Sequence, residues 1–160
     1  MPQRFRRDVR RVVLRAAQED VRAFGGASVE AEHLLLALAG DVASPVGRLL
    51  AESGLDRAGL LGALEHETER SLAAVGVALA DVRPPEPATP PRVGARLGAS
   101  SKRALERAAH AAVARRDRAI TAPHLLLGIL RADLGTVPRA LDLAGVDRPV
   151  LARRAEALLG

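Results

Sequence analysis

Two short stretches, Glu32-His33-Leu34-Leu35-Leu36 and Pro123-His124-Leu125-Leu126-Leu127, decide the fold of this chain. Their last four residues are identical, and the two histidines are 91 residues apart (124 − 33 = 91). The same offset, applied without a gap, matches further residues on both sides: Leu14 with Leu105, Ala17 with Ala108, Val29 with Ile120, Val46 with Val137, Arg48 with Arg139, Leu50 with Leu141, and Gly54, Asp56 and Arg57 with Gly145, Asp147 and Arg148. Chance does not maintain a register over this length, so the chain is an internal duplication.

Each copy has the sequence pattern of four helices. In the first copy, apolar residues recur at steps of three and four between residues 5 and 24, which is typical of an amphipathic helix, and Gly25-Gly26 ends it. The almost wholly apolar run 34–38 predicts a buried central helix. A third helix is expected from Ser44-Pro45, and a fourth from Asp56, which is a good N-cap residue.

The second copy repeats this pattern from about Leu97, with Thr121 as the N-cap of its own buried helix. Between the copies, residues 81–91 contain five prolines, which favour an extended linker. We therefore expect one all-α domain made of a first repeat over residues 1–72, a Pro-rich linker over 73–95 and a second repeat over 96–160.

The composition agrees with a helical, cytoplasmic protein. Hydrophobic residues make up 48% of the chain, but Phe5 and Phe24 are the only aromatic ones, which favours closely packed helices over a sheet. The absence of cysteine excludes disulfides, thiolate metal sites and cysteine nucleophiles, and it suits a reducing compartment. The N-terminus lacks the apolar run of a signal peptide, and no apolar stretch approaches the roughly 18 residues of a membrane span.

No motif in the sequence indicates catalysis. The phosphate-binding Gly-x-x-x-x-Gly-Lys-Ser/Thr loop needs a lysine, and Lys102, the only lysine, has no glycine before it and no Ser or Thr after it. His33 and His124 have no second histidine or carboxylate at i+4, so we expect each to bond a backbone group in its first helical turn. The sequence therefore predicts a protein without a catalytic site, cofactor or metal.

The pattern Ile-x-x-x-His-Leu-Leu-Leu at residues 120–127, followed by Gly145-Val146-Asp147, resembles the Clp N-terminal repeat. The first copy, through Ala17-Gln18-Glu19 and Val29 to Leu36, is similar to the same repeat in ClpC-type unfoldases. The resemblance implies a pseudo-twofold bundle of eight helices. In ClpC and ClpA unfoldases this domain lies ahead of the ATPase rings and receives adaptors and substrates. The resemblance therefore implies that this chain is a non-catalytic protein-recognition module of the Clp unfoldase–protease system, either free-standing or the front part of a ClpC-like chaperone.

The resemblance also implies a ligand for Glu32. Some ClpC proteins recognise phosphorylated arginine as a degradation mark, and the glutamate just before the motif histidine holds the guanidinium. A carboxylate can pair with a planar guanidinium through two hydrogen bonds, and nearby amides and cations would take the phosphate. Pro123 stands at the corresponding place in the second repeat. The alternative for Glu32 is a carboxylate that only interacts favourably with its own helix dipole.

The family has a second binding groove, between the first helices of the two repeats, where adaptors and some cyclic peptide antibiotics dock. The matching residues here are Leu14, Lys102 and Glu106, with Phe5 and Leu97 near the positions where family members usually carry flanking phenylalanines. The alternative for Lys102 and Glu106 is an ordinary i,i+4 pair. A free-standing domain with this groove could also be a decoy that sequesters peptide antibiotics aimed at ClpC.

A basic run supports a function of another class. The arginines between Arg4 and Arg15 could neutralise several phosphates of a nucleic acid, and the formal net charge is +5. Asp8 interrupts the run, and arginine replaces lysine almost throughout the chain, which is a compositional bias. We therefore expect protein partners, and keep a basic helical nucleic-acid-binding protein as the alternative.

Overall fold

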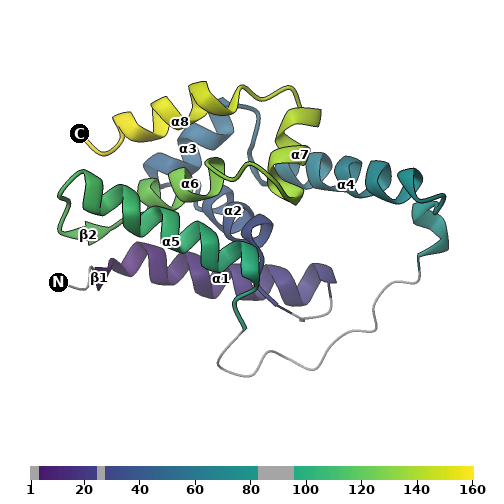
Figure 1. Cartoon of the computed structure of the whole chain (residues 1–160), viewed down its shortest axis with the longest axis horizontal. Helices are drawn as coiled ribbons and strands as arrows, with labels where there is room; N and C mark the ends of the chain where they lie inside the picture. The colour runs from purple at the N-terminus through teal and green to yellow at the C-terminus, as the bar shows by residue number, and fades with distance from the viewer. Residues whose placement is uncertain (1–3, 25–27, 83–95) are drawn as a thin grey trace.

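The computed structural model describes residues 4–24, 28–82 and 96–160, and these form a bundle of α-helices with four helices from each copy (Figure 1). The first copy contributes α1 Arg7–Phe24, α2 Ala31–Gly40, α3 Pro45–Glu52 and α4 Arg57–Ala74. The second contributes α5 Ala99–Ala114, α6 Ala122–Leu130, α7 Thr136–Leu143 and α8 Arg148–Ala157. A 3-10 helix, η1 Leu79–Asp81, and two short strands, β1 Arg4–Phe5 and β2 Ala119–Ile120, accompany them. The predicted all-α class is confirmed.

Two predicted features lie outside the described residues, namely the helix stop at Gly25-Gly26 and the prolines of the linker between residues 84 and 91. Within the segment expected to be the linker, residues 73–95, the structure describes the last two residues of α4 and the 3-10 helix η1.

The predicted N-cap residues lie at the starts of the helices for which they were predicted. The Ser44 hydroxyl accepts a hydrogen bond of 2.9 Å from the backbone N–H of Gly47, and the Asp56 carboxylate accepts one of 2.8 Å from Gly59. At α6, the side chain of His124 accepts a hydrogen bond of 3.1 Å from the backbone N–H of the N-cap residue Thr121, as in a capping box. Each cap satisfies an N–H that has no partner inside its own helix.

The core is centred on α2 and α6, the helices that carry the shared His-Leu-Leu-Leu sequence (Figure 1). All residues of α6 except Pro123, and all residues of α2 except Glu32 and Gly40, are buried. Among the described helices, none is by itself long and apolar enough to cross a membrane; α2 and α3 reach the required length and composition only together, with a bend of 98° between them.

The two repeats interlock at their beginnings. Phe5 of β1 pairs in parallel with Ile120 of β2, and Val29 forms a matching parallel bridge with Leu97. Phe5 and Leu97 precede the first helices of the two repeats, whereas Val29 and Ile120 precede the buried helices. In each repeat, a residue before the first helix therefore pairs with a residue before the buried helix of the other repeat, as a pseudo-twofold arrangement requires.

The gap-free offset of 91 is wrong for the first helices. In the part of α1 whose side chains are described, the buried residues are Val9, Val12 and Ala16, and the buried face of α5 begins with Ser101, Ala104 and Ala108, which gives an offset of 92 (101 − 9 = 92). The pair Leu14 and Leu105 is therefore not equivalent, and Leu14 is 68% exposed. The first copy is one residue longer between its first two helices, so the offset becomes 91 only from α2 and α6 onward.

Candidate functional site

Two clefts lie where the repeats meet, and each combines residues from both. Cleft A, about 570 Å³, lies between the first turns of α2 and α5 and the segment that leads into α7. Its charged and hydroxyl side chains are Glu30, Glu32, Ser100, Arg103, Arg107, Asp133 and Thr136. Cleft B, about 520 Å³, lies between the first turns of α1 and α6 and the segment between α2 and α3. Its charged and hydroxyl side chains are Arg6, Asp8, Arg11, Asp41, Ser44 and Thr121, and Pro123 lies on its wall.

The clefts are images of each other under the duplication. With the corrected offsets, Arg103 of cleft A corresponds to Arg11 of cleft B, and Ser100 corresponds to Asp8. Glu32 corresponds to Pro123, as the sequence predicted. The duplication has therefore kept a cleft of similar volume at the equivalent place in both copies, while the glutamate at the position of Glu32 is present only in cleft A.

Glu32 lies in cleft A as a half-buried carboxylate without a cationic partner among the described residues. Burial raises its pKa above the ordinary glutamate value, and the carboxylates of Glu30 and Glu67 add to the increase. Its own backbone N–H and the neighbouring His33 offset only part of this effect. A desolvated carboxylate close to two others is a favourable receptor for an incoming cation.

Glu30 and Ser100 cap each other's helices across the two repeats. The Ser100 hydroxyl accepts a hydrogen bond of 2.8 Å from the backbone N–H of Ala31, the first residue of α2. In return, the Glu30 carboxylate accepts hydrogen bonds from the Ser100 hydroxyl and, at 3.2 Å, from the Ser100 backbone N–H in the first turn of α5. Although burial alone would raise the pKa of Glu30, the hydroxyls of Ser100 and Ser28 hold it below the ordinary value.

Two arginines of α5 form the cationic side of cleft A. Arg107 donates from Nε to the backbone carbonyl of Gly128 at 2.6 Å, and burial lowers its pKa, as does the nearby charge of Arg103. Arg103 is exposed and forms no ion pair with a described carboxylate. The cleft therefore has an acidic edge on α2 and a basic edge on α5.

An ion pair between a buried carboxylate and an exposed arginine lies behind the acidic edge. Glu67 of α4 is 4% exposed and accepts hydrogen bonds from Arg139 of α7 at 2.7 Å and from the Ser71 hydroxyl at 2.6 Å. Burial alone would raise the pKa of Glu67, but these two donors keep it below the ordinary value. The carboxylate of Glu67 is thus already compensated, whereas that of Glu32 is not.

The residues expected to form the second groove lie outside both clefts. Leu14 on α1, and Lys102 and Glu106 on α5, are exposed, and no ion pair joins Lys102 to Glu106 in the described part of the chain. Phe5 is 37% exposed, and Leu97 is half-buried beside Val29. Their role in binding an adaptor or a peptide remains a prediction.

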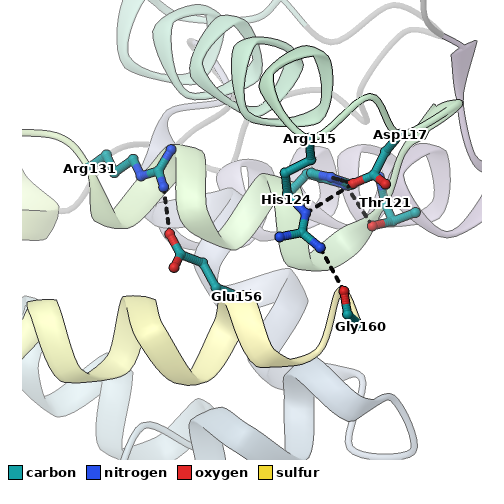
Figure 2. Close-up of polar contacts among 7 residues, drawn as sticks. All are labelled: Arg115, Asp117, Thr121, His124, Arg131, Glu156 and Gly160. Atoms are coloured by element: carbon teal, nitrogen blue, oxygen red, sulfur yellow. Dashed lines mark hydrogen bonds and ion pairs between the residues drawn. The ribbon is translucent and has the colours of Figure 1, made fainter.

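The two motif histidines have the structural role expected of them. The Nδ1 atom of His33 accepts a hydrogen bond of 2.8 Å from the backbone N–H of Glu30, and that of His124 accepts one of 3.1 Å from Thr121. Figure 2 shows His124 between Thr121 and Asp117, whose carboxylate lies 2.9 Å from Nε2. Because Nδ1 accepts, Nε2 carries the proton and donates it to Asp117.

This contact gives the second repeat a pH-dependent contribution to stability. Hydrogen bonds from His124, and then from Arg115, lower the pKa of Asp117 below its usual 3.8. A lowered carboxyl pKa stabilises the fold above the unfolded value, and the contribution is lost as the pH falls through the folded value. We expect Asp117→Asn to be less stable than the wild type at neutral pH, with a difference that closes below pH 3.8. Urea unfolding of both proteins between pH 7 and 2.5 measures this, and a difference independent of pH would contradict it.

Sequence reasoning did not identify Glu30, Ser100 and Arg103. Glu30 stands at the N-cap position of α2, and Ser100 in the first turn of α5. Both positions are visible in the sequence, but their contact joins residues 70 apart. The equivalence of Arg103 with Arg11 would have been visible only with the one-residue gap in the alignment.

Residues 96–160 match the family model described as the Clp repeat (R) N-terminal domain. A search of curated proteins found no match.

Several solved structures are similar over almost the whole chain. The N-terminal domain of the caseinolytic protease associated chaperone ClpD from Arabidopsis thaliana has a TM-score of 0.71 and 20% identity, over 98% of this chain and 98% of that one. The Hsp104 N-terminal domain from Candida albicans has a TM-score of 0.64 and 16% identity, over 99% and 93%. A chain from a malarial protein secretion system has a TM-score of 0.61 and 15% identity, over 96% and 93%. At these identities the similarity shows the fold alone.

Proposed function

We propose that this chain, whose residues 96–160 are a Clp repeat and whose whole length has the fold of Clp N-terminal domains, is a protein-recognition module that binds substrates or adaptors of a Clp unfoldase system. Its task is binding, and the binding surface is cleft A. The fold supports the general class of function, and the side chains of cleft A support the kind of group that is bound.

The proposal rests on the environment of the Glu32 carboxylate. It is a half-buried carboxylate in a cleft of about 570 Å³, without a cationic partner among the described residues. Burial raises its pKa, and the neighbouring carboxylates Glu30 and Glu67 raise it further. An arginine side chain of a bound protein would relieve this unfavourable charge, because a guanidinium can donate two parallel hydrogen bonds to one carboxylate.

Cleft B has no counterpart of this receptor, because Pro123 replaces the glutamate. The domain therefore binds one guanidinium group, through its first repeat. Both unmodified arginine and phosphoarginine contain this group, so the first experiment uses both.

Calorimetric titration with a short peptide that contains one arginine, and with its phosphoarginine form, tests the role of Glu32. We expect saturable binding of at least one peptide near one equivalent, weakened about 10- to 100-fold in Glu32→Gln, since hydrogen bonds to charged groups contribute about 1.5–3 kcal/mol. Glu65→Gln, at an exposed position of α4, is the matched control and should leave binding unchanged.

The pH dependence and the stability of the same variant distinguish a binding role from a structural one. Affinity should fall as the pH decreases through the raised pKa of Glu32, because only the ionised carboxylate pairs with guanidinium. Glu32→Gln should unfold at the same temperature as the wild type or at a higher one, because it removes an uncompensated charge. Absence of binding to either peptide, or binding that is equal in Glu32→Gln, would exclude the proposal.

A further inference from the structure

The N-terminus of α5 is the place in cleft A where an anionic group of a ligand would be held. The backbone N–H groups of the first helical turn have no partner inside the helix and point beyond its N-terminal end, and the helix dipole favours negative charge there. In this chain the position already holds an anion, because the Glu30 carboxylate accepts hydrogen bonds from both the hydroxyl and the backbone N–H of Ser100.

Two further residues, Ser28 and Gly98, favour this position of the Glu30 carboxylate. The Ser28 hydroxyl donates to the other oxygen of the Glu30 carboxylate at 2.9 Å, so both oxygens are held. Gly98, the N-cap residue of α5, lies so close that a Cβ atom at that position would overlap the carboxylate. The glycine is therefore needed for space, since its backbone angles, φ −73° and ψ 174°, are ordinary for any residue.

The remaining charges of cleft A do not favour an additional anion. Three carboxylates, those of Glu30, Glu32 and Asp133, face two guanidinium groups, and the one on Arg107 is already bonded to the Gly128 carbonyl. A phosphoryl group carries about 1.5–2 negative charges at neutral pH. Held next to Glu32, it would lie close to the Glu30 carboxylate and be repelled by it.

We infer that Glu30 is a specificity-determining residue of cleft A, which occupies the anion position at α5 and makes the cleft select unmodified arginine side chains over phosphoarginine. This inference rests on the proposed function, because it assumes that Glu32 receives the guanidinium group. The ligand is then an unphosphorylated, arginine-containing segment of a partner protein.

The test compares the two peptides on three proteins by calorimetry. The wild type should bind the arginine peptide about tenfold more tightly than the phosphoarginine peptide, which corresponds to one carboxylate–phosphate repulsion in a partly solvated cleft. Glu30→Gln keeps an acceptor for Ser100 but removes the charge. Gly98→Ala keeps the charge but displaces the carboxylate from α5. In both variants the preference for the arginine peptide over the phosphoarginine peptide should fall several-fold, because phosphoarginine binding improves.

The outcomes separate this inference from the function on which it rests. A wild type that binds phosphoarginine more tightly, with binding lost in both Glu32→Gln and Arg103→Gln, overturns the inference and leaves the proposed function intact. An unchanged preference in both Glu30→Gln and Gly98→Ala also overturns it. If the wild type binds neither peptide, the proposed function fails and the inference fails with it. Far-ultraviolet circular dichroism of each variant ensures that only folded protein is compared.

Discussion

Gly128→Ala is expected to lower the free energy of unfolding by about 2–3 kcal/mol, although alanine is the better helix former. Gly128 lies inside α6, and a Cβ atom there would overlap the backbone carbonyl of Ala104 and lie 2.9 Å from the backbone nitrogen of Ala108. These are atoms of the α5 main chain, which cannot rotate away as a side chain can. The methyl group would have to push α5 from α6.

The reason for the close approach is the size of the side chains on α5. Its buried face consists of Ser101, Ala104, Ala108, Ala111 and Ala112. Small residues allow the two backbones to come close, and Gly128 completes the contact from α6. The same packing places Arg107 within hydrogen-bond distance of the Gly128 carbonyl, on the basic edge of cleft A.

A matched substitution with the opposite expected sign is available. Gly62 lies inside α4 with open space where a Cβ atom would be, so Gly62→Ala should stabilise the protein by about 0.5–1 kcal/mol through helix propensity. Urea denaturation of the three proteins gives both values. A stabilising effect of Gly128→Ala would contradict the direct contact between Gly128 and the α5 backbone.

His124→Ala is expected to lower the free energy of unfolding by about 2–4 kcal/mol. The side chain is 1% exposed and makes three polar contacts with two residues: the Thr121 N–H, the Thr121 hydroxyl at 2.8 Å and the Asp117 carboxylate (Figure 2). Alanine leaves a cavity and removes the partners of buried or partly buried polar groups, and both effects are costly.

Guanidinium unfolding measures the loss, with His66→Ala as the control. His66 is exposed on α4, and its replacement should change the free energy of unfolding by less than about 0.5 kcal/mol. A loss for His124→Ala no greater than that of the control would mean that the network does not hold the corner between α5 and α6. The far-ultraviolet spectrum should remain helical, because the substitution affects packing and not helix propensity.

Much of the fold was readable from the sequence because it rests on local signals. The four-helix pattern of each copy, the caps at Ser44, Asp56 and Thr121, and the burial of the two Leu-rich helices follow from periodicity and helix-end chemistry. The resemblance to the Clp repeat, carried by residues 120–127, is confirmed by the family match over 96–160 and by the fold. The role expected for Glu32 is still a prediction, as are the roles of the groove residues.

By itself, the sequence determined that the chain is a duplicated all-α domain with one motif glutamate, Glu32, and that the second copy has Pro123 in its place. Only the tertiary structure decided which residues share a cleft. Glu30 and Ser100 are 70 residues apart, and Glu67 and Arg139 are 72 apart. Helical periodicity extends over a few turns, so it contains no information about such pairs. They are created when one repeat packs against the other, and that packing places a carboxylate where the anion of a ligand would otherwise be held.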